Sequence, residues 1–159
     1  MGLITSDMRD IVDSAKLSFA ATVDEDGSPS LSPKGSVRVW DDQHLIFMDI
    51  NSPHTLKNLR RDPRLEICAV DFIRRRGYRF KGTVELLAPG HRAYDWLADW
   101  LLQQNGPGYP AHEAVLLRVE RTLPVLSPAY TFTDISEDSL SQAWAETYGL
   151  VASQGSDDS

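Results

Sequence analysis

The segment Ser52-Pro53-His54-Thr55 has the composition of a helix start that can bind an anion. Serine is a favoured N-cap, and proline is favoured at the first helical position. The free N–H groups and the dipole of a helix N-terminus attract anions such as phosphate, and the hydroxyls of Ser52 and Thr55 can add donors. An ordinary N-cap explains Ser52 and Pro53 equally well and is the commoner situation. The pattern therefore predicts a helix start and permits a phosphate site.

Lys34 stands in a strand-like segment between Pro33 and Gly35. Glycine inside a strand often marks a close approach of backbone or ligand, and proline indicates an edge or a bulge. Together the three residues suggest a strand distorted to receive something, with Lys34 supplying positive charge. A solvated lysine on an exposed face explains Lys34 equally well, so both interpretations stay open.

The polarity alternates over residues 30–40, which predicts one strand with two different faces. We expect one polar face, with Ser32, Lys34, Ser36 and Arg38, and one apolar face, with Leu31, Val37 and Val39. Arg79 and Lys81 alternate in the same way on an expected strand at residues 78–87.

Other kinds of reactive site are not indicated. The four histidines, His44, His54, His91 and His112, are scattered without an HxH or HExxH pattern, so we expect no metal site. No GxSxG is present, and no spacing singles out a catalytic triad, so the catalytic residues stay unknown. Neither GxGxxG nor GxxxxGK[ST] occurs, which argues against a dinucleotide fingerprint and a P-loop.

Composition narrows the class of protein. With 159 residues, 42% of them apolar, we expect one domain over residues 1–150 and a disordered acidic tail at 151–159. The net charge of -7 argues against nucleic acid as a partner. Cys68 is the single cysteine, which excludes an internal disulfide and favours a reducing compartment. No apolar run approaches the ~20 residues that cross a bilayer, and no signal-peptide pattern is present, so we expect a cytoplasmic protein.

Hydrophobic periodicity predicts a mainly β chain with several helices. We expect strands at residues 17–23, 30–40, 44–48, 65–72, 78–87 and 114–119, the last perhaps continuing to 125. Helices are expected at residues 3–15, from Ser52 to Asp62, at 90–104 and at 139–150. Strands joined mostly by hairpins suggest an antiparallel barrel flanked by helices rather than a βαβ sheet.

Three segments in this order resemble a known family. They are ATVDEDGSPSLSPKGSV, LIFMDINSPHTLKNLRRDPRLEI and GYRFKGTVELL. Together they are similar to the FMN-binding split-barrel proteins related to pyridoxamine 5′-phosphate oxidase. The likeness is good over residues 17–87 and holds only in outline elsewhere. It implies a six-stranded antiparallel split barrel that forms a homodimer with FMN at the subunit interface.

The resemblance also implies a set of cofactor-binding residues. Those expected to line the isoalloxazine and ribityl chain are Ser32, Pro33, Lys34 and Gly35, while Met48 and Asp49 border the cofactor and Ser52 opens the phosphate-binding turn. His54 and Thr55 fall where the oxidase has an Arg-Lys pair for the phosphate, and Asn58 lies one turn further along. Arg79 and Lys81 lie on the strand that can reach the cofactor, often from the other subunit.

The resemblance implies an FMN-dependent oxidoreductase that passes electrons from a reduced nicotinamide nucleotide to a small organic acceptor. True pyridoxamine 5′-phosphate oxidase activity is not expected, because the arginine-rich C-terminal motif is missing from TYGLVASQGSDDS. The His54-Thr55 pair also carries less charge than Arg-Lys, so Lys34 or a nearby arginine must contribute more.

Two alternatives remain at this point. The chain could be a flavin-binding module without turnover, used for storage or sensing, because no clear acid–base residue stands beside the expected site. The same barrel could instead hold haem or a deazaflavin, and His54 and His112 are the candidate axial ligands for haem.

Overall fold

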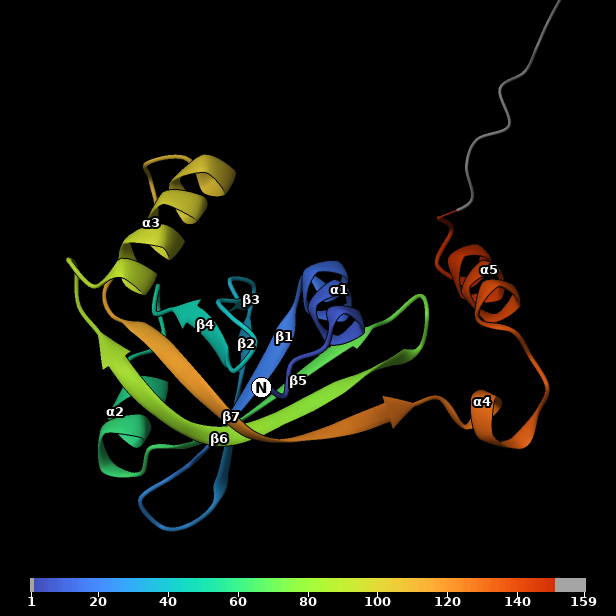
Figure 1. Ribbon diagram of the computed structural model, residues 1–159, viewed down its shortest axis with the longest axis horizontal. Coiled ribbons are helices and arrows are strands. Elements are labelled where there is room, and N and C mark those ends of the chain that lie inside the picture. The colour runs from blue at the N-terminus through green and yellow to red at the C-terminus, as the bar shows by residue number, and fades with distance from the viewer. Residues whose placement is uncertain (1, 151–159) are drawn as a thin grey trace, which may run out of the picture.

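The protein is described from a computed structural model that covers residues 2–150. Seven strands form one antiparallel sheet in the order β2-β1-β5-β6-β7-β4-β3. The strands are β1 (Ser18–Val23), β2 (Pro29–Lys34), β3 (Arg38–Val39), β4 (His44–Met48), β5 (Arg64–Asp71), β6 (Arg76–Leu87) and β7 (Ala114–Leu126). The sheet curls into a half-barrel (Figure 1). The antiparallel barrel with flanking helices is confirmed, with seven strands in place of six.

The additional strand arises because the segment expected as one strand at residues 30–40 is divided in two. β2 pairs with β1 at one edge of the sheet, whereas β3 pairs with β4 at the other edge. Only residues 35–37 connect them. Local alternation cannot reveal this division, because strand pairing depends on partners far away in the sequence.

The faces expected for this segment are wrong for β2. The side chain of Lys34 is buried and Leu31 is 67% exposed, so the polar residues of β2 point inward and Leu31 points outward. Beyond the break, Val37 and Val39 are buried as expected. The interior can take the polar face because its polar groups find hydrogen-bond partners there.

Five helices accompany the sheet within residues 2–150: α1 (Ser6–Ala15), α2 (Pro53–Arg61), α3 (Arg92–Asn105), α4 (Pro128–Phe132) and α5 (Glu137–Thr147). α1 begins as expected, because Oγ1 of its N-cap Thr5 accepts a hydrogen bond from the Met8 N–H at 3.3 Å. The short helix α4 was not predicted. The expected tail at 151–159 lies outside the described residues.

Buried apolar side chains form two clusters. The larger one joins α1 to the inner face of the sheet through residues such as Val12, Phe47 and Phe80. The smaller one packs α3 against β4 and β7 through residues such as Met48 and Leu97. These clusters fix β4 and its flanking helices, and β4 leads directly into the turn before α2.

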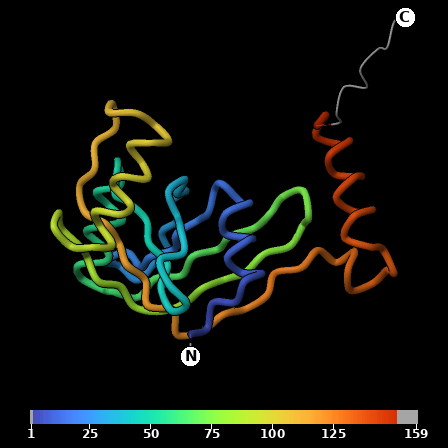
Figure 2. Tube along the Cα trace, turned by 45° about the horizontal axis from the view of Figure 1, so that its top comes forward, coloured from blue at the N-terminus to red at the C-terminus, as the bar shows by residue number. Residues whose placement is uncertain are grey.

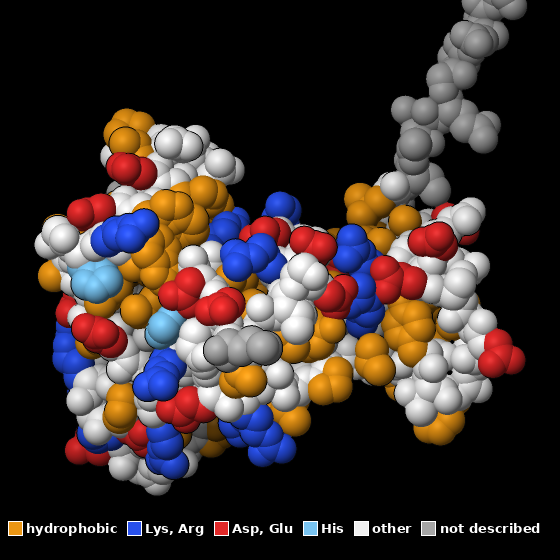
Figure 3. Space-filling view, in the orientation of Figure 1, with side chains coloured by type: hydrophobic (Ala, Val, Ile, Leu, Met, Phe, Trp, Pro, Cys, Tyr) orange, Lys and Arg blue, Asp and Glu red, His pale blue; other side chains and the backbone are white. Residues whose placement is uncertain are grey.

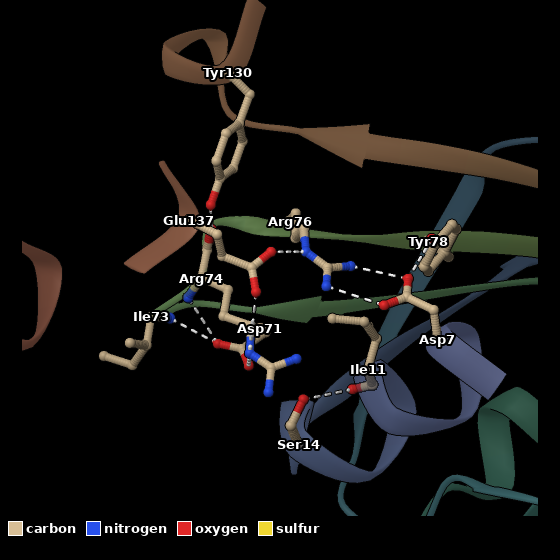
Figure 4. A network of polar contacts seen from close by, with 10 residues as sticks. All are labelled: Asp7, Ile11, Ser14, Asp71, Ile73, Arg74, Arg76, Tyr78, Tyr130 and Glu137. Carbon is tan, nitrogen blue, oxygen red and sulfur yellow. Dashed lines mark hydrogen bonds and ion pairs between the residues drawn. The ribbon is translucent and has the colours of Figure 1, made fainter. Parts of the chain in front are cut away.

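The C-terminal segment 127–150 lies at the opposite end of the sheet from α3 (Figures 1 and 2). Arg76 fastens it there, because its guanidinium bonds both oxygens of Asp7 at 3.0 Å and also bonds Glu137 of α5 (Figure 4). The Tyr130 hydroxyl donates to the carbonyl oxygen of Arg74 at 2.6 Å. The contact therefore joins α1, the β5–β6 hairpin and the C-terminal helices.

Candidate functional site

The most unusual polar group of the molecule is the buried ammonium of Lys34, at the end of β2. Lys34 is 5% exposed. Its Nζ donates to the hydroxyls of Ser32 at 2.5 Å and Ser52 at 2.6 Å, and a longer bond of 3.4 Å reaches the carbonyl oxygen of Pro33. Ser32 belongs to the same strand, whereas Ser52 precedes α2. We call Ser32, Lys34 and Ser52 the lysine cluster.

The charge of Lys34 is not neutralised by direct contact. Within residues 2–150, Lys34 takes part in no ion pair. Burial lowers the pKa of its ammonium, and the nearby carboxylate of Asp49 opposes this shift. The Phe47 ring lies 5.7 Å from Nζ, so the cation also borders the apolar core. An unpaired buried cation with hydroxyl partners is suited to receiving an anion.

Asp49 and Ser52 shape the turn between β4 and α2. The backbone N–H of Ser52 donates to Oδ1 of Asp49 at 2.8 Å. The backbone of Asp49 pairs in turn with the loop before β7, accepting from the His112 N–H at 3.0 Å and donating to the Glu113 carbonyl at 2.8 Å. Ser52 occupies the N-cap position as expected, but its side chain makes no cap hydrogen bond. Its hydroxyl accepts from Lys34 instead.

The next residues of α2 form a separate group around Asp24. His54 Nε2 lies 2.7 Å from Oδ1 of Asp24, and Asn58 donates to the same oxygen at 2.7 Å. Asn58 also donates to Oγ1 of Thr22 at 3.0 Å. The hydrogen bonds from Asn58 and His54 lower the pKa of Asp24. A carboxylate that stays ionised beside His54 repels a phosphate, so this group does not replace the Arg-Lys pair.

Arg79 and Lys81 lie on the outer face of β6, away from the lysine cluster. Both pair with Glu66 on β5, Lys81 at 3.3 Å. The sheet register places Phe19 beside Cys68 and Cys68 beside Arg79, so the same face continues to β1. Leu31 and Phe19 expose 67% and 41% of their surface there. The outer face therefore joins an apolar patch to a charged group.

The remaining expected residues are divided in the same way. Pro33 and Gly35 are exposed at the end of β2 and just after it, whereas Thr55 is buried in α2. The Met48 side chain is buried against α3, and its N–H accepts a partner in Ser36 Oγ at 3.0 Å. One chain thus brings together Ser32, Lys34, Asp49 and Ser52, and leaves the groups of His54 and Arg79 apart.

Three residues matter more than their sequence context suggested. Asp24 reads as part of the Asp-Glu-Asp-Gly hairpin turn, Glu66 as an ordinary strand residue and Ser36 as one polar position among several. A carboxylate directly before a hairpin turn is the one signal that could have identified Asp24. Its pairing with α2 depends on the fold and is not local.

The chain belongs to the pyridoxamine 5′-phosphate oxidase family, whose family model matches residues 4–125. HupZ of Group A Streptococcus is a structural relative with 33% identity, over 79% of this chain and 96% of that chain, and a TM-score of 0.69. A putative pyridoxamine 5′-phosphate oxidase from Lactobacillus delbrueckii has 26% identity, over 76% and 93% of the chains, and a TM-score of 0.63. The expected family is confirmed.

A more distant structure shares the fold. It is an FMN-binding protein from Syntrophomonas wolfei, with 18% identity over 76% of this chain and 90% of that chain, and a TM-score of 0.59. The search of curated proteins gives no match. Within residues 2–150, no three His, Cys, Asp or Glu side chains are placed to hold a metal ion, and no helix is long and apolar enough to cross a membrane.

Proposed function

We propose that this protein binds FMN between two copies of the chain and passes electrons from a reduced nicotinamide nucleotide to a small organic acceptor. The observation that carries the proposal is the lysine cluster in a member of this family. We assign it to the phosphate end of FMN. The lone Cys68 favours a reducing compartment, and we propose the cytoplasm.

The residues of the lysine cluster fit a phosphate. Ser32 and Ser52 each accept a hydrogen bond from Lys34, so each hydroxyl keeps its own hydrogen for a further acceptor. A phosphate oxygen is such an acceptor, and its charge would balance the ammonium. The residues therefore match the needs of a phosphate monoester in type and in charge.

A second copy of the chain would complete the site. Lys34 points into one protomer, whereas Arg79 and Lys81 lie on the outer face, so they cannot meet within a single chain. The exposed Leu31 and Phe19 beside them supply an apolar surface of the kind that dimers bury. A partner docked on this face can bring its own Arg79 or Lys81 toward the cofactor.

When bound, FMN supplies the redox chemistry of its flavin ring. The chain positions the cofactor, and Lys34 offsets its negative charge. Hydride transfer to a flavin often needs no acid–base residue, so the lack of one beside the lysine cluster is compatible with turnover.

The test is an absorbance spectrum of the purified full-length protein, with the mass of any released cofactor, followed by NADH and NADPH oxidation with an electron acceptor. We expect flavin bands, the mass of FMN and enzyme-like turnover. A protein without flavin absorbance after incubation with FMN would contradict the proposal. FMN binding without turnover would leave a storage or sensing module, and a Soret band after loading with haem alone would favour a haem protein.

A further inference from the structure

A second cavity lies between α1 and α3 and is not part of the lysine cluster. Its volume is about 380 Å³, which is within the usual range for small-molecule sites. Lys and Arg side chains gather on the surface between these two helices (Figure 3). The charged and aromatic residues that line the cavity are Arg9, Asp13, Lys16, Arg38, Trp96 and Trp100. We call it the tryptophan cavity.

The lining of this cavity is positively charged in an otherwise acidic protein. Three cations, Arg9, Lys16 and Arg38, face one carboxylate, Asp13, whereas the whole chain has a net charge of -7. Within residues 2–150, none of the three cations takes part in an ion pair. The lining can therefore attract a small dianion.

Arg38 is held in a fixed position. Its guanidinium carbon lies 3.9 Å from the centre of the Trp100 ring, and Nη1 donates to the Val37 carbonyl at 2.6 Å. Burial lowers the pKa of this guanidinium, and Asp13 opposes the shift. Stacking on an indole leaves the other N–H groups free for a planar or tetrahedral anion. Arg38 is thus prepared to bind phosphate without reordering its long side chain.

Indole rings form the other part of the wall. Trp96 is 39% exposed and meets Trp40 edge-on, with the ring centres 5.4 Å apart. An exposed indole held by another aromatic ring offers a flat surface on which a ligand ring can stack. The cavity combines this surface with the three cations, so its ligand should carry both a ring and an anion.

We propose that the tryptophan cavity binds an aromatic phosphate monoester of the size of a nucleoside monophosphate. The phosphate would lie against Arg38, Arg9 and Lys16, and the ring against Trp96 or Trp100. A phosphate monoester carries about -1.5 to -2 charges at neutral pH, which suits three cations opposed by one carboxylate. This site does not depend on the FMN proposal, because Lys34 does not line the cavity.

Calorimetric titration of the full-length protein with AMP, adenosine and inorganic phosphate tests the proposal. We expect AMP to bind at least about 10-fold more tightly than either of the other two probes, since each lacks one half of the recognition. Arg38→Gln should weaken AMP binding about 10-fold or more. Arg92→Gln is the matched control, because Arg92 also lies over an indole of this region, 5.8 Å from the Trp40 ring centre, but does not line the cavity.

Further arms protect the test against a misfolded variant and against overlap with the flavin site. Lys16 is exposed, so Lys16→Gln should fold and still weaken AMP. Lys34→Met should leave AMP binding unchanged, and saturating FMN should not displace AMP. The proposal is overturned if AMP binds no better than adenosine, if Arg38→Gln and Lys16→Gln both bind AMP like wild type, or if FMN competes with AMP.

Discussion

The ammonium of Lys34 lies 2.6 Å from the hydroxyl of Ser52, and this contact joins the end of β2 to the start of α2. A serine at an N-cap usually bonds the helix backbone, which contributes about 1 kcal/mol. Here the Ser52 side chain makes no such bond. Sequences break local rules of this kind mostly at functional sites, which is consistent with the role proposed for the lysine cluster.

Leu31→Asp should separate the proposed dimer. Leu31 is 67% exposed on the outer face of β2, so the substitution should leave the fold of one protomer unchanged. A carboxylate in a buried apolar contact is costly, and we expect a monomer by analytical ultracentrifugation, with loss of bound FMN. Leu102→Asp, at an exposed position of α3, is the control and should stay dimeric. A Leu31→Asp protein that sediments like wild type would exclude this face as the interface.

Two glycine substitutions should separate stability from cofactor binding. A Cβ at Gly77 would clash with the carbonyl oxygen of Ala69 in the β5–β6 pair, so Gly77→Ala should cost about 2–4 kcal/mol in urea unfolding. A Cβ at Gly35 meets nothing within 4 Å, so Gly35→Ala should change stability by less than about 0.5 kcal/mol. Gly35→Ala should nevertheless weaken FMN about 10-fold, because the added methyl would meet the proposed ring. Unchanged FMN affinity would place the ring elsewhere.

Arg76→Gln should loosen the C-terminal helices. Arg76 is largely buried and bonds both Asp7 and Glu137, so its removal leaves two carboxylates without their partner (Figure 4). We expect a loss of about 1–3 kcal/mol in urea unfolding and faster protease cleavage between α4 and α5. Arg64→Gln is the control, since Arg64 is 72% exposed and pairs only with Asp62, and it should cost less than about 1 kcal/mol. Equal cleavage rates in the two variants would argue against this fastening.

Asp7→Asn should alter the acid sensitivity of the fold. Hydrogen bonds from Arg76 and Tyr78 hold the pKa of Asp7 below its ordinary value of 3.8. A carboxylate with a lowered pKa contributes stability that is present above the unfolded pKa and lost as the pH falls through the folded pKa. Asp7→Asn should therefore be less stable than wild type at neutral pH, and its stability should fall less steeply below about pH 4.

Urea unfolding at several pH values measures this effect. Asp10→Asn, at an exposed position of the same helix, is the control and should follow the wild-type curve. Parallel loss of stability below about pH 4 in wild type and Asp7→Asn would show that Asp7 contributes little.

The helices and hairpins could be predicted where their signals are local. Pro53 at the first helical position and Asp62-Pro63 after the last turn define α2, and Asp26-Gly27 defines the β1–β2 turn, where Gly27 has a φ of +85°. These residues act within a few positions along the chain, so their meaning does not depend on the rest of the fold.

The division between β2 and β3 and the partners of α2 could not be predicted in the same way. Leu31 faces outward because β2 pairs with β1, and His54 contacts Asp24 because the β1–β2 turn lies near α2. Sequence alone placed His54 and Lys34 at one phosphate. The structure joins Lys34 to Ser52 and joins His54 to a carboxylate, a difference that only the distant pairing decides.

The most direct measurement is the affinity of wild type, Lys34→Met and Lys57→Met for FMN and for riboflavin, which lacks the phosphate. Lys57 is an exposed lysine of α2 and serves as the control, and circular dichroism verifies the fold of each variant. The proposed site predicts that Lys34→Met weakens FMN by about 10- to 100-fold, leaves riboflavin nearly unchanged, and has no counterpart in Lys57→Met. Equal losses for FMN and riboflavin, or no loss for either, would contradict the assignment of the phosphate to Lys34.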